Sequence, residues 1–180
     1  MTNIVWIYGS SASGKATFIN RLLNNLSQDL IDRLGWKNKK IICVEESIKY
    51  VGQFNNDPVL KKRIQIINKV KNLSNKSNLV ILIKGQDVDL KSNLPNILQE
   101  ELPNAKHQII FLHADLQILY ERCRKKTWWT KEDEEAGIED FKEWLSKQLR
   151  RLKQLKNFKI TTLDSSDYEY RQIKFPPEIK

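Results

Sequence analysis

Short apolar runs alternate with longer stretches of helical periodicity along this chain, and the alternation constrains its fold more than any other feature. Strands are predicted at 4–8, 41–44, 79–83, 109–112 and 160–163. Helices are predicted over 15–26, from 57 past 70, and over 92–102, 116–126 and 138–155. Because strands that alternate with helices form parallel sheets covered on both faces, we predict an α/β fold with three layers, α/β/α, around a five-stranded parallel sheet.

Length and composition limit the remaining classes. The 180 residues predict a single domain, 1–180, and 40% hydrophobic with 29% charged residues is typical of a globular chain. The 31 basic residues exceed the 22 acidic ones by 9, which favours nucleotides, nucleic acid or anionic lipid as partners. Cys43 and Cys123 form no disulfide framework, so a reducing cytoplasm is expected. With apolar runs of only about five residues, we expect no membrane span, and the N-terminus has no features of a signal peptide.

The segment after the first strand carries the clearest functional signal. It has the spacing G-x-x-x-x-G-K and opens the first predicted helix. Small residues let the main chain wrap a phosphate, and successive amides and the helix N-terminus attract its charge. We therefore predict that a nucleotide is bound by Gly9, Ser10, Ser11, Ala12, Ser13, Gly14, Lys15, Ala16 and Thr17. The alternative is a Gly/Ser-rich turn that binds nothing.

In this loop the chain resembles the P-loop NTPase superfamily, and within it the small nucleoside and nucleotide kinases. Most of that superfamily has Ser or Thr directly after the lysine, whereas this chain has Ala16 and then Thr17. G-K-A-T is similar to the G-K-G-T of adenylate and cytidylate kinases, which hold Mg²⁺ largely through water. The resemblance implies a P-loop fold, ATP and Mg²⁺ as cofactors, Lys15 on the terminal phosphates and Thr17 on the α-phosphate.

Acids at the ends of the second and third strands are the next candidates. In open parallel sheets, ligands bind beyond the carboxyl ends of the strands. Glu45 is placed there to accept a proton from an acceptor hydroxyl or to hold hydrated Mg²⁺, and a helix-capping role is equally open. After the third strand, Lys84 stands where adenylate kinases carry an acid. Asp87 or Asp89 then substitutes from the following loop, unless both are solvated loop acids.

Two arginines and a polar segment follow the fourth strand. Arg122 and Arg124 end the helix 116–126, and at least one is predicted to stabilise the charge on a transferred phosphoryl group. The alternative is a basic helix end favoured by the helix dipole. Residues 127–137 are the predicted lid, with Trp128 and Trp129 either stacking on substrate or packing the loop onto the body. Its acids, 132–135, are expected to pair with the basic residues of the next helix.

These features predict an ATP-dependent phosphotransferase, a kinase, with a small-molecule or nucleotide acceptor that the sequence leaves unidentified. GTP-binding proteins need an N-K-x-D segment, which 68–71 and 75–78 both lack, so ATP is favoured. Two alternatives remain. Ala16 and Lys84 at usual metal-ligand positions suit a nucleotide-binding module without turnover. The net charge suits a polynucleotide kinase-like protein, although no nucleic-acid-binding signature is present.

Overall fold

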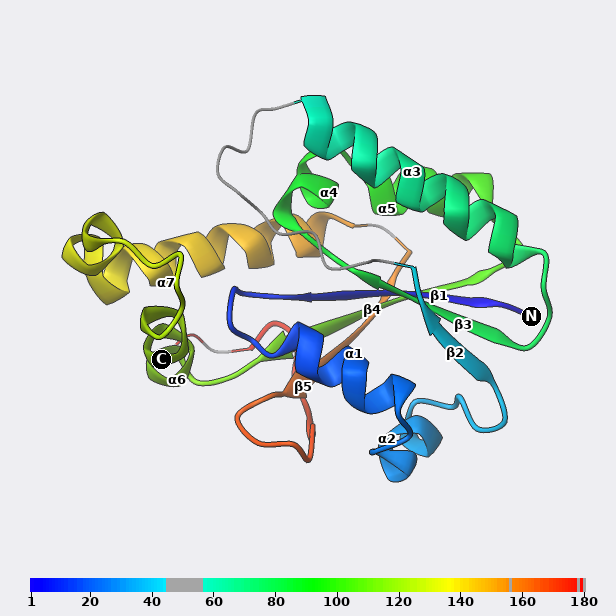
Figure 1. Ribbon diagram of the computed structural model, residues 1–180, viewed down its shortest axis with the longest axis horizontal. Coiled ribbons are helices and arrows are strands. Elements are labelled where there is room, and N and C mark those ends of the chain that lie inside the picture. Colours follow the sequence, from blue (N-terminus) through cyan, green and yellow to red (C-terminus); the bar gives the residue numbers. More distant parts are fainter. Residues whose placement is uncertain (45–56, 156, 178, 180) are drawn as a thin grey trace.

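The computed structural model describes residues 1–44, 57–155, 157–177 and 179, and it builds them around one six-stranded sheet (Figure 1). The strands are β1 Asn3–Gly9, β2 Lys40–Cys43, β3 Leu79–Lys84, β4 Lys106–His113, β5 Lys159–Asp164 and β6 Gln172–Ile173. The helices are α1 Lys15–Leu23, α2 Gln28–Arg33, α3 Asp57–Ser74, α4 Asp87–Lys91, α5 Leu94–Glu101, α6 Leu116–Arg124 and α7 Lys131–Gln154.

The sheet has the strand order β2-β3-β1-β4-β5-β6. The first five strands pair in parallel, and β6 runs antiparallel to β5 through Thr162↔Ile173 and Leu163↔Gln172. The α/β prediction with five parallel strands is therefore confirmed. The short sixth strand was not predicted, because two residues are too few to show a periodic pattern.

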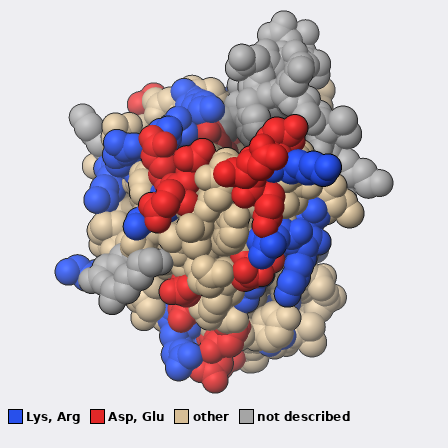
Figure 2. All heavy atoms as spheres, turned by 90° about the vertical axis from the view of Figure 1, so that its left-hand side faces the viewer, with Lys and Arg blue, Asp and Glu red and all other residues tan. Residues whose placement is uncertain are grey.

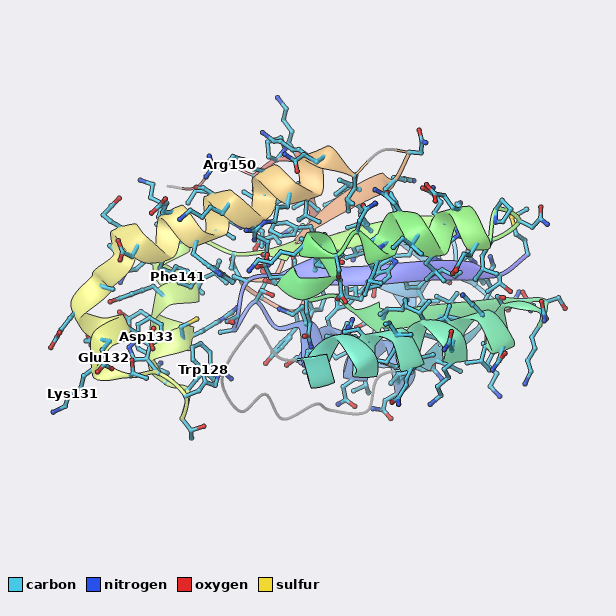
Figure 3. The ribbon with its side chains drawn as sticks, turned by 90° about the horizontal axis from the view of Figure 1, so that it is seen from above. Trp128, Lys131, Glu132, Asp133, Phe141 and Arg150 are labelled. Carbon is cyan, nitrogen blue, oxygen red and sulfur yellow. The ribbon has the colours of Figure 1, made fainter. Side chains whose placement is uncertain are left out.

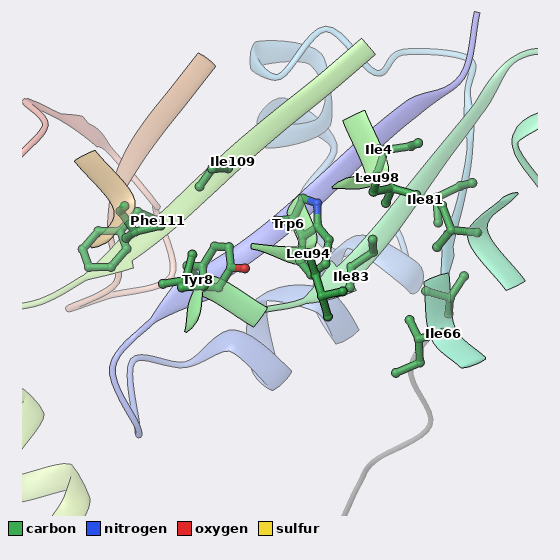
Figure 4. Close-up of a cluster of buried hydrophobic side chains, with 14 of the residues drawn as sticks. Ile4, Trp6, Tyr8, Ile66, Ile81, Ile83, Leu94, Leu98, Ile109 and Phe111 are labelled. Atoms are coloured by element: carbon green, nitrogen blue, oxygen red, sulfur yellow. The ribbon is translucent and has the colours of Figure 1, made fainter. Parts of the chain in front are cut away.

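The strand β1 lies at the centre of the sheet and is buried along its whole length. Its side chains alternate between two cores, as the two-residue period of a strand requires. Ile4, Trp6 and Tyr8 belong to the larger core, which α3, α5, α6 and α7 cover (Figure 4). Val5 and Ile7 belong to the smaller one, which α1 and α2 cover. Figure 1 shows these layers with α3, α4, α5 and α7 above the sheet and α1 and α2 below it.

The carboxyl ends of the parallel strands share one edge of the sheet, where the backbones of β1 and β3 stay close. The Gly85 amide follows β3 and donates to the Ile7 carbonyl over 2.9 Å. A Cβ on Gly85 would lie 2.6 Å from Cδ1 and 2.7 Å from Cζ of Tyr8. This edge therefore has room for a glycine after β3 and for little else.

The predicted helices differ from the observed ones in several places. The first helix ends at Leu23 instead of residue 26, and α2 and α4 were not predicted. The predicted helix 92–102 begins at Leu94, because Asn93 takes a left-handed conformation (φ 57°) at its N-cap. Residues 131–136, assigned to the lid, are helical and join 138–154 across Gly137, whose φ of 77° breaks the helix. The single-domain division and the lid at 127–137 stay predictions.

Among the described residues, no helix combines the length and the apolar character needed to cross a membrane.

A buried histidine at the amino end of β4 predicts a pH dependence of stability. Burial lowers the pKa of His107 below its usual value of 6.5, and its hydrogen bond with the Leu102 carbonyl (2.9 Å) opposes the shift. The unfolded chain therefore takes up this proton first as pH falls. The contribution of His107 to stability is complete above about pH 6.5 and declines below it.

This sign predicts a difference between the wild type and His107→Gln. By urea denaturation, we expect the free energy of unfolding to fall more steeply from about pH 7 to 5 in the wild type than in His107→Gln. Parallel curves would contradict this account.

Candidate functional site

The turn between β1 and α1 has the backbone of a tightly wrapped loop. Three of its residues have positive φ: Gly9 at 148°, Ala12 at 60° and Gly14 at 87°. A Cβ on Gly9 would collide with the Ser13 hydroxyl and lie 2.5 Å from the Leu112 carbonyl oxygen. Glycine is thus required at the start of the loop by contact with β4 as well as by its backbone conformation.

The N-terminus of α1 faces this loop without a capping side chain. Gly14 is the N-cap residue, no side chain caps the helix, and its first turn contains no acidic residue. The first turn of a helix leaves its amides without intrahelical partners, and its dipole places partial positive charge there. The helix end therefore has the properties of an anion site, and the binding of a nucleotide there stays a prediction.

Lys15 folds back over the loop. Its Nζ donates to the carbonyl oxygens of Gly9 over 2.7 Å and Ser10 over 2.8 Å. Next to it, Ala16 and Thr17 are exposed, and the Thr17 hydroxyl makes no hydrogen bond to another described residue. Lys15 is thus held on carbonyls of the loop, and Thr17 is exposed two residues further along α1.

The end of α6 packs against the same loop. The thiol of Cys123 donates to the Ser11 carbonyl over 3.4 Å. Burial raises the pKa of Cys123 to about 11, so the group is a protonated packing thiol and not a nucleophile. No local pattern in the sequence indicates this contact, which joins residues 112 positions apart.

Arg122 and Arg124 both lie beside this contact, and the protein's own oxygens hold both of them. Arg122 donates from Nη1 to the Ser165 carbonyl (3.0 Å) and from Nη2 to the Ser166 carbonyl (2.9 Å). It thereby fixes the segment that follows β5. Arg124 Nε donates to Glu134 over 2.9 Å, and its Nη1 contacts Glu121 at 3.3 Å. Their predicted catalytic role therefore requires at least one of them to change partners.

The end of β3 contains a buried ion pair that sequence reasoning missed. Asp89 (0% exposed) and Arg63 (1%) meet through two bonds of 2.7 Å. The Gln86 amide also donates to Asp89 over 2.8 Å, and Arg63 Nη2 donates to the Lys84 carbonyl over 3.2 Å. Burial raises the pKa of Asp89, and the Arg63 guanidinium opposes that shift. The pair fixes the backbone after β3 to α3, and no short motif indicates it.

The predicted metal ligands do not come together among the described residues. Asp87 is the first residue of α4, and its carboxylate pairs with Lys91 at 3.1 Å and with Arg151. Glu45 lies outside the described residues. In the part of the chain that the structure describes, no group of three or more His, Cys, Asp or Glu side chains could hold a metal. The metal role of Thr17, Glu45 and Asp87 therefore stays a prediction.

The two tryptophans of the predicted lid have different environments. Trp129 packs edge-on against Tyr120, with ring centroids 5.4 Å apart, and its Nε1 donates to Glu134 over 2.9 Å. Trp128 is 49% exposed. Figure 3 shows it on the side of the lid segment that faces the sheet, with Lys131 turned outward. Trp129 thus packs the loop onto α6, whereas Trp128 remains available to a ligand.

A separate cavity of about 370 Å³ lies beyond the C-terminal end of α1. The residues that line it include Arg21, Arg33 and Tyr168, and the Arg21 guanidinium lies 4.9 Å from the Tyr168 ring centroid. None of the predicted site residues that the structure describes lines this cavity.

No protein-family model matches the chain, and no curated protein matches it. Among solved structures, APE1195 is 17% identical over 93% of this chain and 88% of its own, with a TM-score of 0.50. A shikimate kinase from Bacteroides thetaiotaomicron is 15% identical over 94% and 90%, with a TM-score of 0.48. A deoxyadenosine kinase from M. mycoides, solved with bound dATP, is 14% identical over 92% and 93%, with a TM-score of 0.46. The likeness to APE1195 shows a shared fold, at an identity too low to show a shared activity.

The buried ion pair predicts a large loss of stability when one partner is neutralised. Asp89→Asn leaves the Arg63 guanidinium buried without its counter-ion, so we expect the free energy of unfolding to fall by about 3–5 kcal/mol. The matched control is Asp29→Asn, because Asp29 pairs with Arg33 in an exposed i,i+4 arrangement at 3.3 Å. That change should cost about 1 kcal/mol or less.

Chemical denaturation of the two variants measures both values. Replacing both partners, in Arg63→Met with Asp89→Leu, should recover much of the lost stability, because no buried charge remains. A loss in Asp89→Asn no larger than that in Asp29→Asn would show that the pair does not hold this edge together.

Proposed function

We propose that the protein binds ATP through Gly9–Thr17 and transfers its γ-phosphate to a small-molecule acceptor. The observation that carries the proposal is the geometry of the loop. Two glycines with positive φ, an uncapped helix N-terminus and a lysine folded over the loop's own carbonyls converge at the end of the central strand. Amides and a cation arranged in this way suit the oxygens of a polyphosphate.

In the proposed reaction an acceptor oxygen attacks the γ-phosphorus. The bond from the γ-phosphorus to the bridging oxygen breaks, ADP leaves, and the acceptor proton passes to a carboxylate, for which we propose Glu45. Lys15 stabilises the terminal phosphates, and Arg122 or Arg124 contributes positive charge to the transferred group. Mg²⁺, when bound, would neutralise part of the phosphate charge, with Thr17, Glu45 and Asp87 as its candidate ligands, reached through water.

Two observations bear on the setting and the partners. Cys43 and Cys123 are both free thiols, which suits the reducing cytoplasm that we propose. Figure 2 shows the face that carries the lid segment, and its described residues mix acidic with basic side chains. A mixed surface offers a nucleic acid little continuous attraction, so we favour a small-molecule acceptor over an oligonucleotide.

A non-catalytic nucleotide-binding module remains the second candidate. The observation in its favour is that Asp87, a candidate metal ligand, already pairs with Lys91 and Arg151. A protein that only binds nucleotide needs no acid to orient a metal.

The proposed binding step predicts that ATP raises the Tm of the wild type more than that of Lys15→Ala. With ATP at 100 times its Kd, the wild type should gain about 2.7 kcal/mol, which raises Tm by roughly 5–10 °C in a chain of this size. Lys15→Ala should show little ATP-dependent shift, because it lacks the cation that meets the terminal phosphates. The shift is compared within each protein, since Lys15 also bonds two carbonyls of the free loop.

Differential scanning fluorimetry measures these shifts. Lys37→Ala is the control, because Lys37 is exposed and lies in the turn before β2, at the opposite edge of the sheet. Equal ATP-dependent shifts in the wild type and Lys15→Ala would exclude the loop as the binding site.

The proposed catalytic step predicts that ATP labelled with ³²P in its γ-phosphate transfers the label to a small-molecule acceptor. The panel comprises nucleosides, nucleotides, sugars and oligonucleotides. We expect a labelled product with a nucleoside, nucleotide or sugar, and loss of that product in Lys15→Ala. Binding of ATP with no transfer to any acceptor would favour the non-catalytic module, and transfer to oligonucleotides alone would favour the polynucleotide kinase.

A further inference from the structure

The end of α6 lies against the phosphate loop, and two arginines flank the residue that makes the contact. Cys123 touches the Ser11 carbonyl at 3.4 Å and so places this helix end against the loop. Neighbouring residues of a helix are separated by about 100° around its axis, given 3.6 residues per turn. Arg122 and Arg124 therefore flank Cys123. Neutral carbonyls hold Arg122, whereas carboxylates hold Arg124.

Arg124 is held by bonds on all three of its nitrogens. Nε donates to Glu134 Oε2 over 2.9 Å, and Nη2 contacts Glu134 Oε1 at 2.7 Å. The third nitrogen, Nη1, contacts Glu121 Oε1 at 3.3 Å. The guanidinium thus presents its side to one carboxylate of the lid segment, with the two-pronged geometry that it also uses for phosphate.

Glu134 is fixed independently of Arg124. Its Oε2 also accepts a hydrogen bond from Trp129 Nε1 over 2.9 Å. The start of its helix is held by a capping box between Thr130 and Asp133. If Arg124 leaves, Glu134 therefore stays where it is, and the arginine is the mobile member of the pair.

We propose that the Arg124–Glu134 pair is a latch in which Glu134 competes with nucleotide phosphate for the Arg124 guanidinium. The side chains of Arg124 and Glu134 are 42% and 45% exposed, and exposed ion pairs contribute little free energy. A triphosphate at the neighbouring loop carries more negative charge than one carboxylate and offers the same bidentate geometry. Glu134 is thus a positioning residue that keeps Arg124 off the loop until nucleotide arrives. The latch rests on the proposed nucleotide site.

The test is the affinity of Glu134→Gln for ATP. Glutamine keeps an acceptor for Trp129 and removes the charge that competes for Arg124. We expect the Kd for ATP to fall by about twofold to fivefold, the range that an exposed ion pair supplies. In acceptor assays, KM for ATP should fall by a similar factor while kcat does not fall. Glu135→Gln is the matched control, since Glu135 is the exposed acid that follows in the same helix, and it should bind ATP as the wild type does.

A second variant separates the latch from a general charge effect. In an Arg124→Met background, Glu134→Gln should no longer tighten binding, because no guanidinium remains to be released. Isothermal titration calorimetry with ATP and Mg²⁺ measures all of these proteins. Unchanged or weaker binding in Glu134→Gln, equal tightening in Glu135→Gln, or tightening that persists without Arg124 would each overturn the latch. If the wild type itself binds no ATP, the proposed function falls as well.

Discussion

The arrangement of the site depends on the central position of β1. Its backbone pairs with β3 from Asn3 to Ile7 and with β4 from Asn3 to Gly9. Both faces are buried, so the strand can neither slide nor tilt without disrupting two cores. Gly9 is therefore held at a fixed point, close to both the Leu112 carbonyl and Ser13, and the loop begins there.

The cationic side chains around the loop bond oxygen atoms of the protein itself, and these oxygens are of two kinds. Lys15 and Arg122 bond neutral main-chain carbonyls, and Arg124 bonds exposed carboxylates. These partners are weak enough to be exchanged for phosphate oxygens. Arg63 differs, because its pair with Asp89 is fully buried and loses far more when separated. Among the described residues, the buried pair thus shapes the backbone after β3, whereas the contacts around the loop are ones that we propose phosphate oxygens replace.

The five parallel strands and the loop between β1 and α1 could be predicted from the sequence, because each depends on residues close together in the chain. Apolar runs located β1 and β3 within about two residues, and the spacing from Gly9 to Lys15 located the loop. The Arg63–Asp89 pair could not be predicted, since its members are 26 residues apart and ordinary in their local sequence. Helix 131–136 was missed for another reason. Its acids lack an apolar face, so a capping box rather than periodicity marks its start.

The acidic residues of the lid segment have ion-pair partners other than those that the sequence predicts. The sequence predicted pairing with the basic residues of the following helix, whereas Glu134 pairs with Arg124, and Arg151 of that helix pairs with Asp87. A carboxylate near bound phosphate weakens binding through repulsion, unless a cation lies between the two. We propose Arg124 for that role, because Glu134 holds it at the end of α6 that contacts the loop. The charge of Glu134 is then a determinant of nucleotide affinity, although this residue belongs to no recognisable nucleotide motif.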